Sequence, residues 1–260
     1  MREVTSFVRR GSRLSTSRRQ AWDRLSDRYV LDVPRGERDT VPAPDERLDP
    51  ADAFGRSAPL VVEIGSGLGE NIAAAAAAHP ERDHLACDVY IPGLAQTLAR
   101  LDRQGCPDNV RLLPLDALRA LPILMAPGSI DELWVFFPDP WHKARHHKRR
   151  LIGPMFAQRV LPLLADGGVL RVATDWAQYA AHMREQLDPD PRLESLCPQG
   201  EPPAGTASDP IPETMPERGW APRFEGRVLT SFERKAHSAG RLIWDLAYRK
   251  VPHEAESESR

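Results

Sequence analysis

The residues whose chemistry is most telling lie between positions 134 and 150. An apolar run ends at Pro138, and a single carboxylate, Asp139, lies between this proline and Pro140. Trp141 follows, and after it comes a cationic block without any acid, formed by Lys143, Arg145, Lys148, Arg149 and Arg150. A tryptophan can stack on a base, and clustered positive charge binds phosphates. Together they predict a site at which a carboxylate contacts a stacked base while the cationic block binds the nucleic-acid backbone.

A glycine loop forms the second candidate site. Residues 60–64 are a short apolar run that predicts a buried strand, and Gly65, Gly67 and Gly69 follow it before an alanine-rich helix. Glycines at such a turn let the backbone approach a ligand closely. The dinucleotide fingerprint would place its third glycine where Glu70 stands, and an acid there repels a pyrophosphate. The loop therefore favours a cationic or zwitterionic ligand and disfavours a dehydrogenase.

Acidic residues end or follow five predicted strands. The strands span residues 60–64, 84–87, 110–113, 130–137 and 169–173, and the acids are Glu63, Asp88, Asp116, Asp139 and Asp175. In an open parallel sheet, ligands bind outside the carboxyl ends of the strands. Asp88 is placed to accept both hydroxyls of a ribose, and Asp116 with Ala117 to face an adenine edge. A ligand with an adenosine, an ammonium and a sulfonium is S-adenosylmethionine, which we predict as the cofactor.

The order of the elements predicts the fold class. The strands alternate with helices at 92–104, 151–164 and 176–187, which is typical of an α/β protein with a doubly wound, mostly parallel sheet. A last strand is expected at 241–250. Its alternating apolar residues belong to the core and not to a site, and they are Leu242, Trp244, Leu246 and Tyr248.

Proline and charge indicate the domain organisation. We predict a globular domain at 59–251, with a proline-rich loop insertion at 188–223. Residues 1–58 are expected to form a basic N-terminal arm and a proline-rich linker, partly disordered, and residues 252–260 a disordered tail. The first 20 residues hold six arginines and one glutamate, which suits either a disordered arm or an arm that binds phosphates.

Composition narrows the class of protein. Hydrophobic residues make up 41% of the 260 and the net charge is −2, so only local clusters point to nucleic acid. No apolar run reaches the roughly 20 residues of a membrane span, so we expect a cytoplasmic protein without membrane contact. The three cysteines are scattered, and the histidines near Trp141 lack a carboxylate or cysteine at ligand spacing, so we expect no metal. The oligomeric state is not predicted.

Two motifs carry a resemblance to known families. Residues 61–69 resemble the first motif of class I S-adenosylmethionine-dependent methyltransferases, and residues 136–146 resemble the signature of the bacterial tRNA (guanine-N7)-methyltransferases, the TrmB family. Further stretches agree in order and spacing: 6–10, 173–176, 230–234, Gly240 and 244–246. The resemblance implies a Rossmann-like fold with a seven-stranded sheet and helices on both faces. It also implies methyl transfer to N7 of a variable-loop guanine in tRNA, at position 46.

The resemblance also implies roles for individual residues. Cofactor contacts fall on Glu63, Asp88, Asp116 and Asp139, beside the glycine loop and Ala117, and the catalytic role falls on Asp139. RNA contacts fall on Lys143, Asp175, Thr230, Ser231, Phe232 and Glu233. Ser231 stands where a basic residue is common in the family. From the residues alone, Asp175 and Glu233 are equally consistent with structural caps. Arg145 is expected to bind phosphate, and Trp141 either stacks on a base or packs on its loop.

The chemistry of guanine N7 determines what the site has to supply. N7 carries a lone pair and no proton, so it attacks the sulfonium methyl group without a general base. The site therefore needs mainly proximity and in-line geometry. Asp139 is expected to orient the guanine, to offset the positive charge that develops on it, or both.

Two other functions remain open. The first is a class I methyltransferase that acts on another RNA or on a protein. The second is a tRNA-binding scaffold that does not catalyse a reaction. The site of methylation would separate the first from our prediction, and binding of S-adenosylmethionine would separate the second.

Overall fold

A computed structural model describes residues 14–205 and 210–252 of the chain. The strands form one seven-stranded sheet in the order β3-β2-β1-β4-β5-β7-β6. Strands β1 to β5 pair in parallel, and β7 runs antiparallel to both β5 and β6. This confirms the predicted mostly parallel sheet. The strands are β1 Leu60–Ile64, β2 Asp83–Cys87, β3 Val110–Leu113, β4 Ile130–Phe136, β5 Leu164–Thr174, β6 Leu193–Ser195 and β7 Trp244–Lys250.

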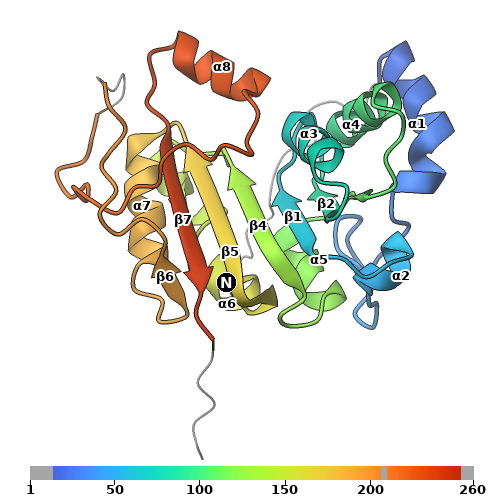
Figure 1. Cartoon of the computed structure of the whole chain (residues 1–260), viewed down its shortest axis with the longest axis horizontal. Coiled ribbons are helices and arrows are strands. Elements are labelled where there is room, and N and C mark those ends of the chain that lie inside the picture. The colour runs from blue at the N-terminus through green and yellow to red at the C-terminus, as the bar shows by residue number, and fades with distance from the viewer. Residues whose placement is uncertain (1–13, 206–209, 253–260) are drawn as a thin grey trace, which may run out of the picture.

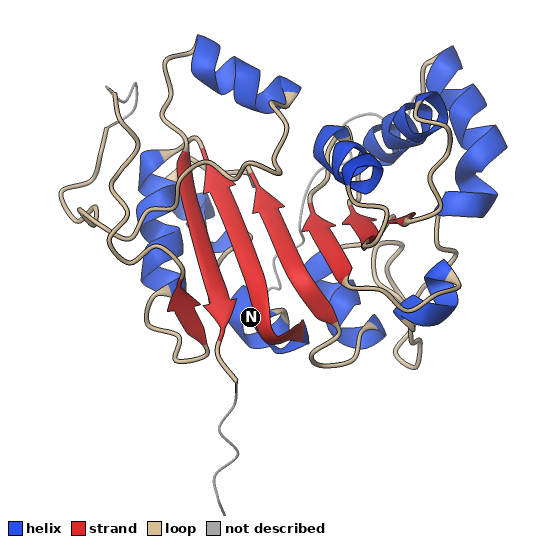
Figure 2. Cartoon of the chain, viewed as in Figure 1, coloured by secondary structure: helices blue, strands red, loops and turns tan. Residues whose placement is uncertain are grey.

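Helices cover both faces of the sheet (Figure 1, Figure 2). One face packs against α2 Pro50–Phe54, α5 Ala117–Leu124, α6 Pro154–Arg159 and α7 Ala177–Leu187. The other packs against α1 Thr16–Tyr29, α3 Glu70–Ala78 and α4 Ile91–Arg103. Two 3-10 helices, Ala144–Arg149 and Leu161–Leu163, lie in the connections. The last helix, α8 Ser231–Ser238, lies beyond the carboxyl ends of the central strands (Figure 1).

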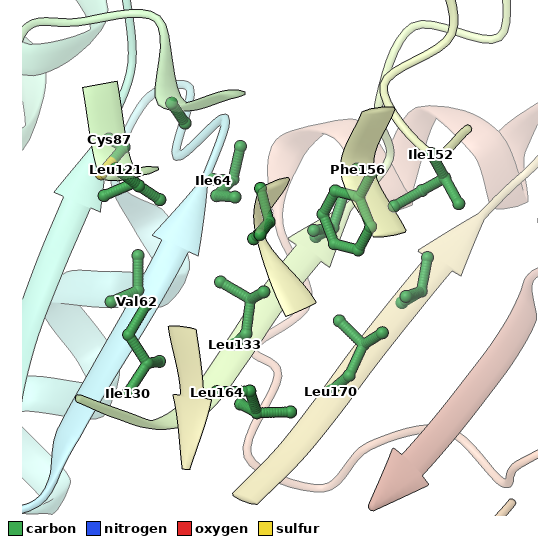
Figure 3. Close-up of a cluster of buried hydrophobic side chains, with 14 of the residues drawn as sticks. Val62, Ile64, Cys87, Leu121, Ile130, Leu133, Ile152, Phe156, Leu164 and Leu170 are labelled. Carbon is green, nitrogen blue, oxygen red and sulfur yellow. The ribbon is translucent and has the colours of Figure 1, made fainter. Parts of the chain in front are cut away.

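The alternation of side chains along each strand builds the two halves of the core. Val62 of β1 points to the same face as Leu133 of β4 and Leu170 of β5, where Leu121 and Phe156 cover them (Figure 3). The neighbouring residue Val61 points to the opposite face and packs in the second cluster. Central strands therefore read as continuous apolar runs, because both of their faces are buried.

The strand order creates a crevice at the carboxyl ends of the central strands β1 and β4. The chain passes from β1 to β2 on one side and later starts β4 on the other side of β1. Connections that leave β1 and β4 in opposite directions separate there, and ligands of doubly wound sheets bind at this point. Helix α8 lies beyond the same edge (Figure 1).

Residues 32–58 do not form the predicted linker. Val33 and Phe54 are buried in the main core cluster, and the N–H of Leu31 donates to the carbonyl of Leu112 at 2.9 Å. The N–H of Leu48 donates to the carbonyl of Leu124, where α5 ends. Few large apolar residues are present in this segment, but Val33, Leu48 and Phe54 pack against the core. Residues 1–13 of the predicted arm and 253–260 of the predicted tail lie outside the described residues.

Two further predictions differ from the structure. The segment 188–223 is not only a surface loop, because it contributes the edge strand β6 and the buried Trp220, whose ring centroid lies 4.8 Å from that of Trp244. The helix predicted at 151–164 is limited to α6, with Pro154 in its first turn and Pro162 soon after its end. Proline lacks the N–H that a continuous helix would need.

Candidate active site

Two adjoining pockets occupy the crevice at the carboxyl ends of the strands. The first, about 280 Å³, is lined by the predicted residues Gly65, Asp88, Asp116, Ala117, Asp139 and Trp141. The second, about 290 Å³, is lined by Glu63, Gly65, Gly67, Thr230, Ser231 and Phe232. Gly65, Phe136 and Phe137 belong to both pockets. The fold thus gathers residues from four strand ends and α8 into one region, while Gly69, Lys143, Arg145, Asp175 and Glu233 line neither pocket.

The three glycines of the loop have positive φ angles, but Gly65 and Gly67 leave space at the pocket whereas Gly69 allows two helices to pack. Gly65 and Gly67 have open space where a side chain would be, as a close ligand requires. A Cβ on Gly69 would lie 2.1 Å from Oγ1 of Thr97, so this glycine lets α3 pack against α4. A Cβ on Gly93 would lie 2.1 Å from the carbonyl oxygen of Gly67. Sequence reasoning missed Gly93, although a glycine directly after Pro92 in the first turn of a helix was a visible signal.

Asp88 organises the loop through its carboxylate. The oxygen Oδ2 accepts from the N–H of Gly67 at 2.8 Å, and Oδ1 accepts from the N–H of Tyr90 at 2.8 Å. Burial raises the pKa of Asp88, and these backbone donors act against that rise. One carboxylate therefore connects the glycine loop to the start of α4 and faces the first pocket.

Glu63 is a buried acid of the site whose pKa lies well above its ordinary value. It is 4% exposed, and its Oε1 accepts from Nδ2 of Asn71 at 3.4 Å. Its Oε2 is buried and has no hydrogen-bond partner among the described residues. Burial, together with the nearby charge of Asp88, raises the pKa of Glu63 to about 8, despite the hydrogen bond from Asn71. A buried carboxylate with an oxygen of this kind fits a cationic group of a ligand. Asn71 was not predicted.

Asp116 forms part of the wall of the first pocket. It is 2% exposed, and its Oδ2 lies 3.5 Å from Nε of Arg119, one turn along α5. Its N–H donates to the carbonyl of Thr40 at 2.8 Å. The segment before α2, taken for a linker in sequence, therefore helps to place this acid and the adjacent Ala117.

A strained turn carries Asp139. Phe137 and Trp141, two residues before and two after it, have φ angles of 53° and 48°, a region that non-glycine residues rarely adopt. Such conformations cost free energy and persist where the surroundings impose them, often at functional sites. Asp139 is exposed at the first pocket, and its Oδ1 accepts from the N–H of Trp141 at 3.4 Å. The turn fixes a carboxylate where solvent and a substrate can reach it.

The cationic block divides into exposed and buried members. Lys143, Arg145, Lys148 and Arg149 are exposed in and before the 3-10 helix. Arg150 is 7% exposed, donates from Nε to the carbonyl of Pro140 at 3.0 Å, and lies 4.8 Å over the ring of Tyr179. The prediction that Arg150 belongs to the phosphate-binding block is therefore wrong, because this side chain supports the turn that carries Asp139.

Trp141 is half-buried and partly engaged. The guanidinium of Arg149 lies 5.0 Å from its ring, and the ring of His146 meets it at an interplanar angle of 87°. Arginine over an aromatic face is a favourable contact. This packing agrees with one of the two predicted roles, and base stacking stays a prediction.

The four residues of the α8 motif differ in accessibility. Thr230 caps the helix, since its Oγ1 accepts from the N–H of Glu233 at 3.1 Å. Phe232 is 51% exposed, and its ring lies 5.7 Å from that of Phe137. Ser231 donates from both N–H and hydroxyl to Glu70, at 2.6 and 2.7 Å. In this structure the hydroxyl of Ser231 is therefore bound within the protein.

Two predicted substrate contacts have structural partners. Glu233 is fully buried and accepts from the guanidinium groups of Arg223 and Arg227. Asp175 is 5% exposed, and its Oδ2 accepts from Nη1 of Arg241 at 2.6 Å. Both acids are thus paired with arginines within the protein, which is a structural role but not the helix cap expected as the alternative. Sequence reasoning could not pair them with arginines on other segments.

Metal and membrane features are limited in the described part of the chain. Residues 14–205 and 210–252 contain no group of three or more histidine, cysteine, aspartate or glutamate side chains that could hold a metal ion. No described helix has the length and apolar character needed to cross a membrane. Cys87, Cys106 and Cys197 are free thiols.

Comparison with known proteins adds independent findings. Residues 57–246 match the model of a family described as a putative methyltransferase. A tRNA (guanine-N(7)-)-methyltransferase of Arthrobacter sp. (strain FB24) is 47% identical, with 95% of this chain and 86% of that protein covered. Proteins of the same name from Cutibacterium acnes and Paraburkholderia xenovorans are 44% and 39% identical over 96% of this chain and 84% of each relative.

Proposed function

We propose that this chain, which belongs to the tRNA (guanine-N7)-methyltransferase family, transfers the methyl group of S-adenosylmethionine to N7 of a guanine in tRNA. The products are 7-methylguanosine in tRNA and S-adenosylhomocysteine. Guanine 46 of the variable loop is the target within this proposal, on the strength of the motif at 136–146. A cytoplasmic location is part of the same proposal.

One observation carries the assignment of the chemistry. Asp139 is held on a strained turn at a pocket whose other walls include Asp88 and Asp116, and the adjoining pocket includes Glu63. A carboxylate that is fixed and open to solvent stands next to acids that are buried or half-buried. This division supports a substrate role for Asp139 and cofactor roles for the other three.

The described residues fit S-adenosylmethionine as the cofactor. Glu63 would hold the ammonium group, since its buried Oε2 has no other partner among the described residues. Asp88 would accept the ribose hydroxyls, and Asp116 with Ala117 would face the adenine edge. When bound, the cofactor supplies an electrophilic methyl group on a sulfonium. Gly65 and Gly67 leave room for it beside the backbone.

The protein's contribution to the reaction is mainly placement. Guanine N7 has no proton to remove, so no side chain has to act as a general base. Asp139 accepts hydrogen bonds from the guanine edge that carries N1–H and the exocyclic amine, and its charge stabilises the positive charge that develops on the base. Pro138, Pro140 and the buried Arg150 keep this carboxylate in place. Correct placement alone can lower a barrier by roughly 7–11 kcal/mol in favourable cases.

The RNA backbone binds along the 3-10 helix Ala144–Arg149 and the residues just before it. Lys143, Arg145, Lys148 and Arg149 offer exposed positive charge for phosphates. The exposed ring of Phe232 beside Phe137 offers an aromatic surface at the second pocket. Because counterions are released when phosphates are bound, tRNA affinity should fall steeply with salt.

The proposal is tested with tRNA that lacks this modification. The chain is incubated with S-adenosylmethionine and a tRNA transcript, and the digested nucleosides are analysed for 7-methylguanosine. A transcript with adenine in place of guanine 46 is the matched control and should remain unmodified. Methylation of another position would replace the proposed target. Cofactor binding by calorimetry without methylation of any tRNA would instead favour a scaffold.

A further inference from the structure

Two consecutive residues at the start of α3 connect the glycine loop to α8. Glu70 accepts two hydrogen bonds on one oxygen, Oε2, from the N–H and the hydroxyl of Ser231. Asn71 accepts on Oδ1 from the N–H of Val228 at 3.2 Å. These contacts join segments about 160 residues apart in the chain. The first turn of the cofactor-side helix therefore holds the entry to the helix beyond the strand ends.

The surroundings of Glu70 are specialised for an ionised carboxylate. Its other oxygen, Oε1, lies 3.2 Å from Nη2 of Arg100 and 3.6 Å from Nη2 of Arg234. Arg100 also donates from Nε to the carbonyl of Leu68, within the glycine loop. Burial tends to raise the pKa of Glu70, but the bonds from Ser231 and the two arginines lower it on balance. One charged group thus touches the loop-binding Arg100 and two residues of α8.

Asn71 extends the same connection to the cofactor acid. Its Nδ2 donates to Oε1 of Glu63 while its Oδ1 accepts from Val228. Asn71 is 3% exposed, so water does not readily replace either partner. The connection therefore runs from Glu63, through the start of α3, to the chain that enters α8.

Displacement of α8 would change the wall of the second pocket that lies opposite the glycine loop. Thr230, Ser231, Phe232 and Lys235 line the second pocket opposite Gly65 and Gly67. The first turn of α8 has a second attachment, because Arg227 donates both to Glu233 of this turn and to Asp245 of β7. Without Glu70, the first turn of α8 keeps this attachment but loses the contact of Ser231 with the start of α3.

We propose that Glu70 is a positioning residue for the RNA substrate, which acts through Ser231 to keep the start of α8 in register with the glycine loop. This inference rests on the proposed function and adds a residue that takes no part in the chemistry itself. It also explains how a chain with serine at position 231 uses that position, since its hydroxyl binds Glu70. The RNA contact expected there passes to its neighbours on α8.

The test is a double-mutant cycle of Glu70→Ala and Ser231→Ala, read out in tRNA methylation and in cofactor affinity. Glu70→Ala is expected to lower kcat/KM for tRNA by about tenfold or more, since small misplacements at a site can have effects of this size. The Kd for S-adenosylmethionine should change by less than about threefold, a small share of that loss. Ser231→Ala, which removes one of the two bonds, should have a smaller effect of the same kind.

The coupling energy between positions 70 and 231 tests whether Glu70 acts through Ser231. If Glu70 acts through Ser231, the double variant should be no worse than Glu70→Ala alone, because the pair is broken once. Glu70→Gln keeps an acceptor for the N–H of Ser231 and should recover part of the activity. Glu81→Gln is the matched control, an exposed glutamate just after α3. Thermal unfolding of each variant identifies loss of fold.

Where the variants lose activity, two results would overturn the inference. One is strict additivity of the two substitutions, and the other is a loss of cofactor affinity as large as the loss of methylation. If the unsubstituted chain forms no 7-methylguanosine, the proposed function fails instead. If it does form the product while Glu70→Ala and Ser231→Ala are fully active, only the role of Glu70 fails.

Discussion

The acids of the cofactor side of the site (Glu63, Asp88 and Asp116) and of the substrate side (Asp139) have similar positions in the sequence. In the fold they differ in burial and in their partners. Acids end or follow five strands, yet Glu63 and Asp116 are buried in the pockets, whereas Asp139 is exposed on a strained turn. Asp175 lies at a fifth strand end and is paired with Arg241. Location at the carboxyl end of a strand is therefore not sufficient to assign a role. Burial and partners distinguish an acid that meets a charged ligand from one that supports a loop.

The largest effect is expected at the substrate side. Asp139→Ala removes the carboxylate that orients the guanine and offsets its charge, so turnover should fall by about a hundredfold or more. Cofactor affinity should remain within about threefold, which is what separates the two sides. Single-turnover methylation and calorimetry measure the two quantities. Asp45→Ala is the control, because Asp45 is exposed in the segment that packs at the end of α5.

Glu63, an acid of the cofactor side, should make the stability of the folded protein depend on pH. The pKa of Glu63, about 8 when folded, lies above its ordinary value of 4.5, so the folded state retains a proton that the unfolded chain loses. The wild type should therefore lose stability as the pH rises from about 4.5 to about 8. Glu63→Gln lacks this loss and should gain on the wild type by about 4 kcal/mol at pH 8, with little difference at pH 4.5.

Chemical unfolding of the cofactor-free protein at several pH values measures this difference. The same variant should bind S-adenosylmethionine less tightly, because the negative charge opposite the ammonium is gone. A Glu63→Gln variant whose stability follows the wild type across this range would show that the acid is not held protonated.

The backbone of the cofactor side gives a smaller test. A Cβ on Gly93 would lie 2.1 Å from the carbonyl oxygen of Gly67, and backbone cannot move aside as a side chain can. Gly93→Ala should therefore distort the glycine loop and weaken S-adenosylmethionine binding by about tenfold, in proportion to the lost fit. Calorimetry measures the affinity. An unchanged affinity would mean that the loop does not approach the cofactor.

The smallest effect is expected among the cations, where two arginines of the same segment should behave differently. Arg145→Ala should weaken tRNA binding about threefold and lower the slope of affinity against salt by about one, as loss of one phosphate contact does. Arg150→Ala should instead lower the melting temperature, because it removes a buried guanidinium under the turn. Binding titrations at several salt concentrations, with thermal unfolding, separate the two outcomes.

Local patterns predicted much of this fold and part of its site. Apolar runs identified β1 to β5 and β7, since a buried strand needs such a run, and the motif around Asp139 marked the substrate side. Arg149 and Arg150 are chemically identical neighbours, and only the 3-10 helix decides which of them is buried. The hydrogen bonds that Ser231 donates to Glu70 and Arg227 donates to Asp245 join distant segments, and no local pattern predicts such pairs. The three-residue strand β6 is too short for a periodic signal.

The position of β7 has a consequence for synthesis on the ribosome. This strand pairs between β5 and β6, although it follows both of them in the chain. The edge strand β6 therefore has no partner in the sheet until residues 244–250 have left the exit tunnel. The buried Arg227 likewise gains its second carboxylate, Asp245, only at this stage, and with it the attachment of α8 to β7. A nascent chain can assemble the glycine loop on β1 to β5 well before the surface formed by α8 exists.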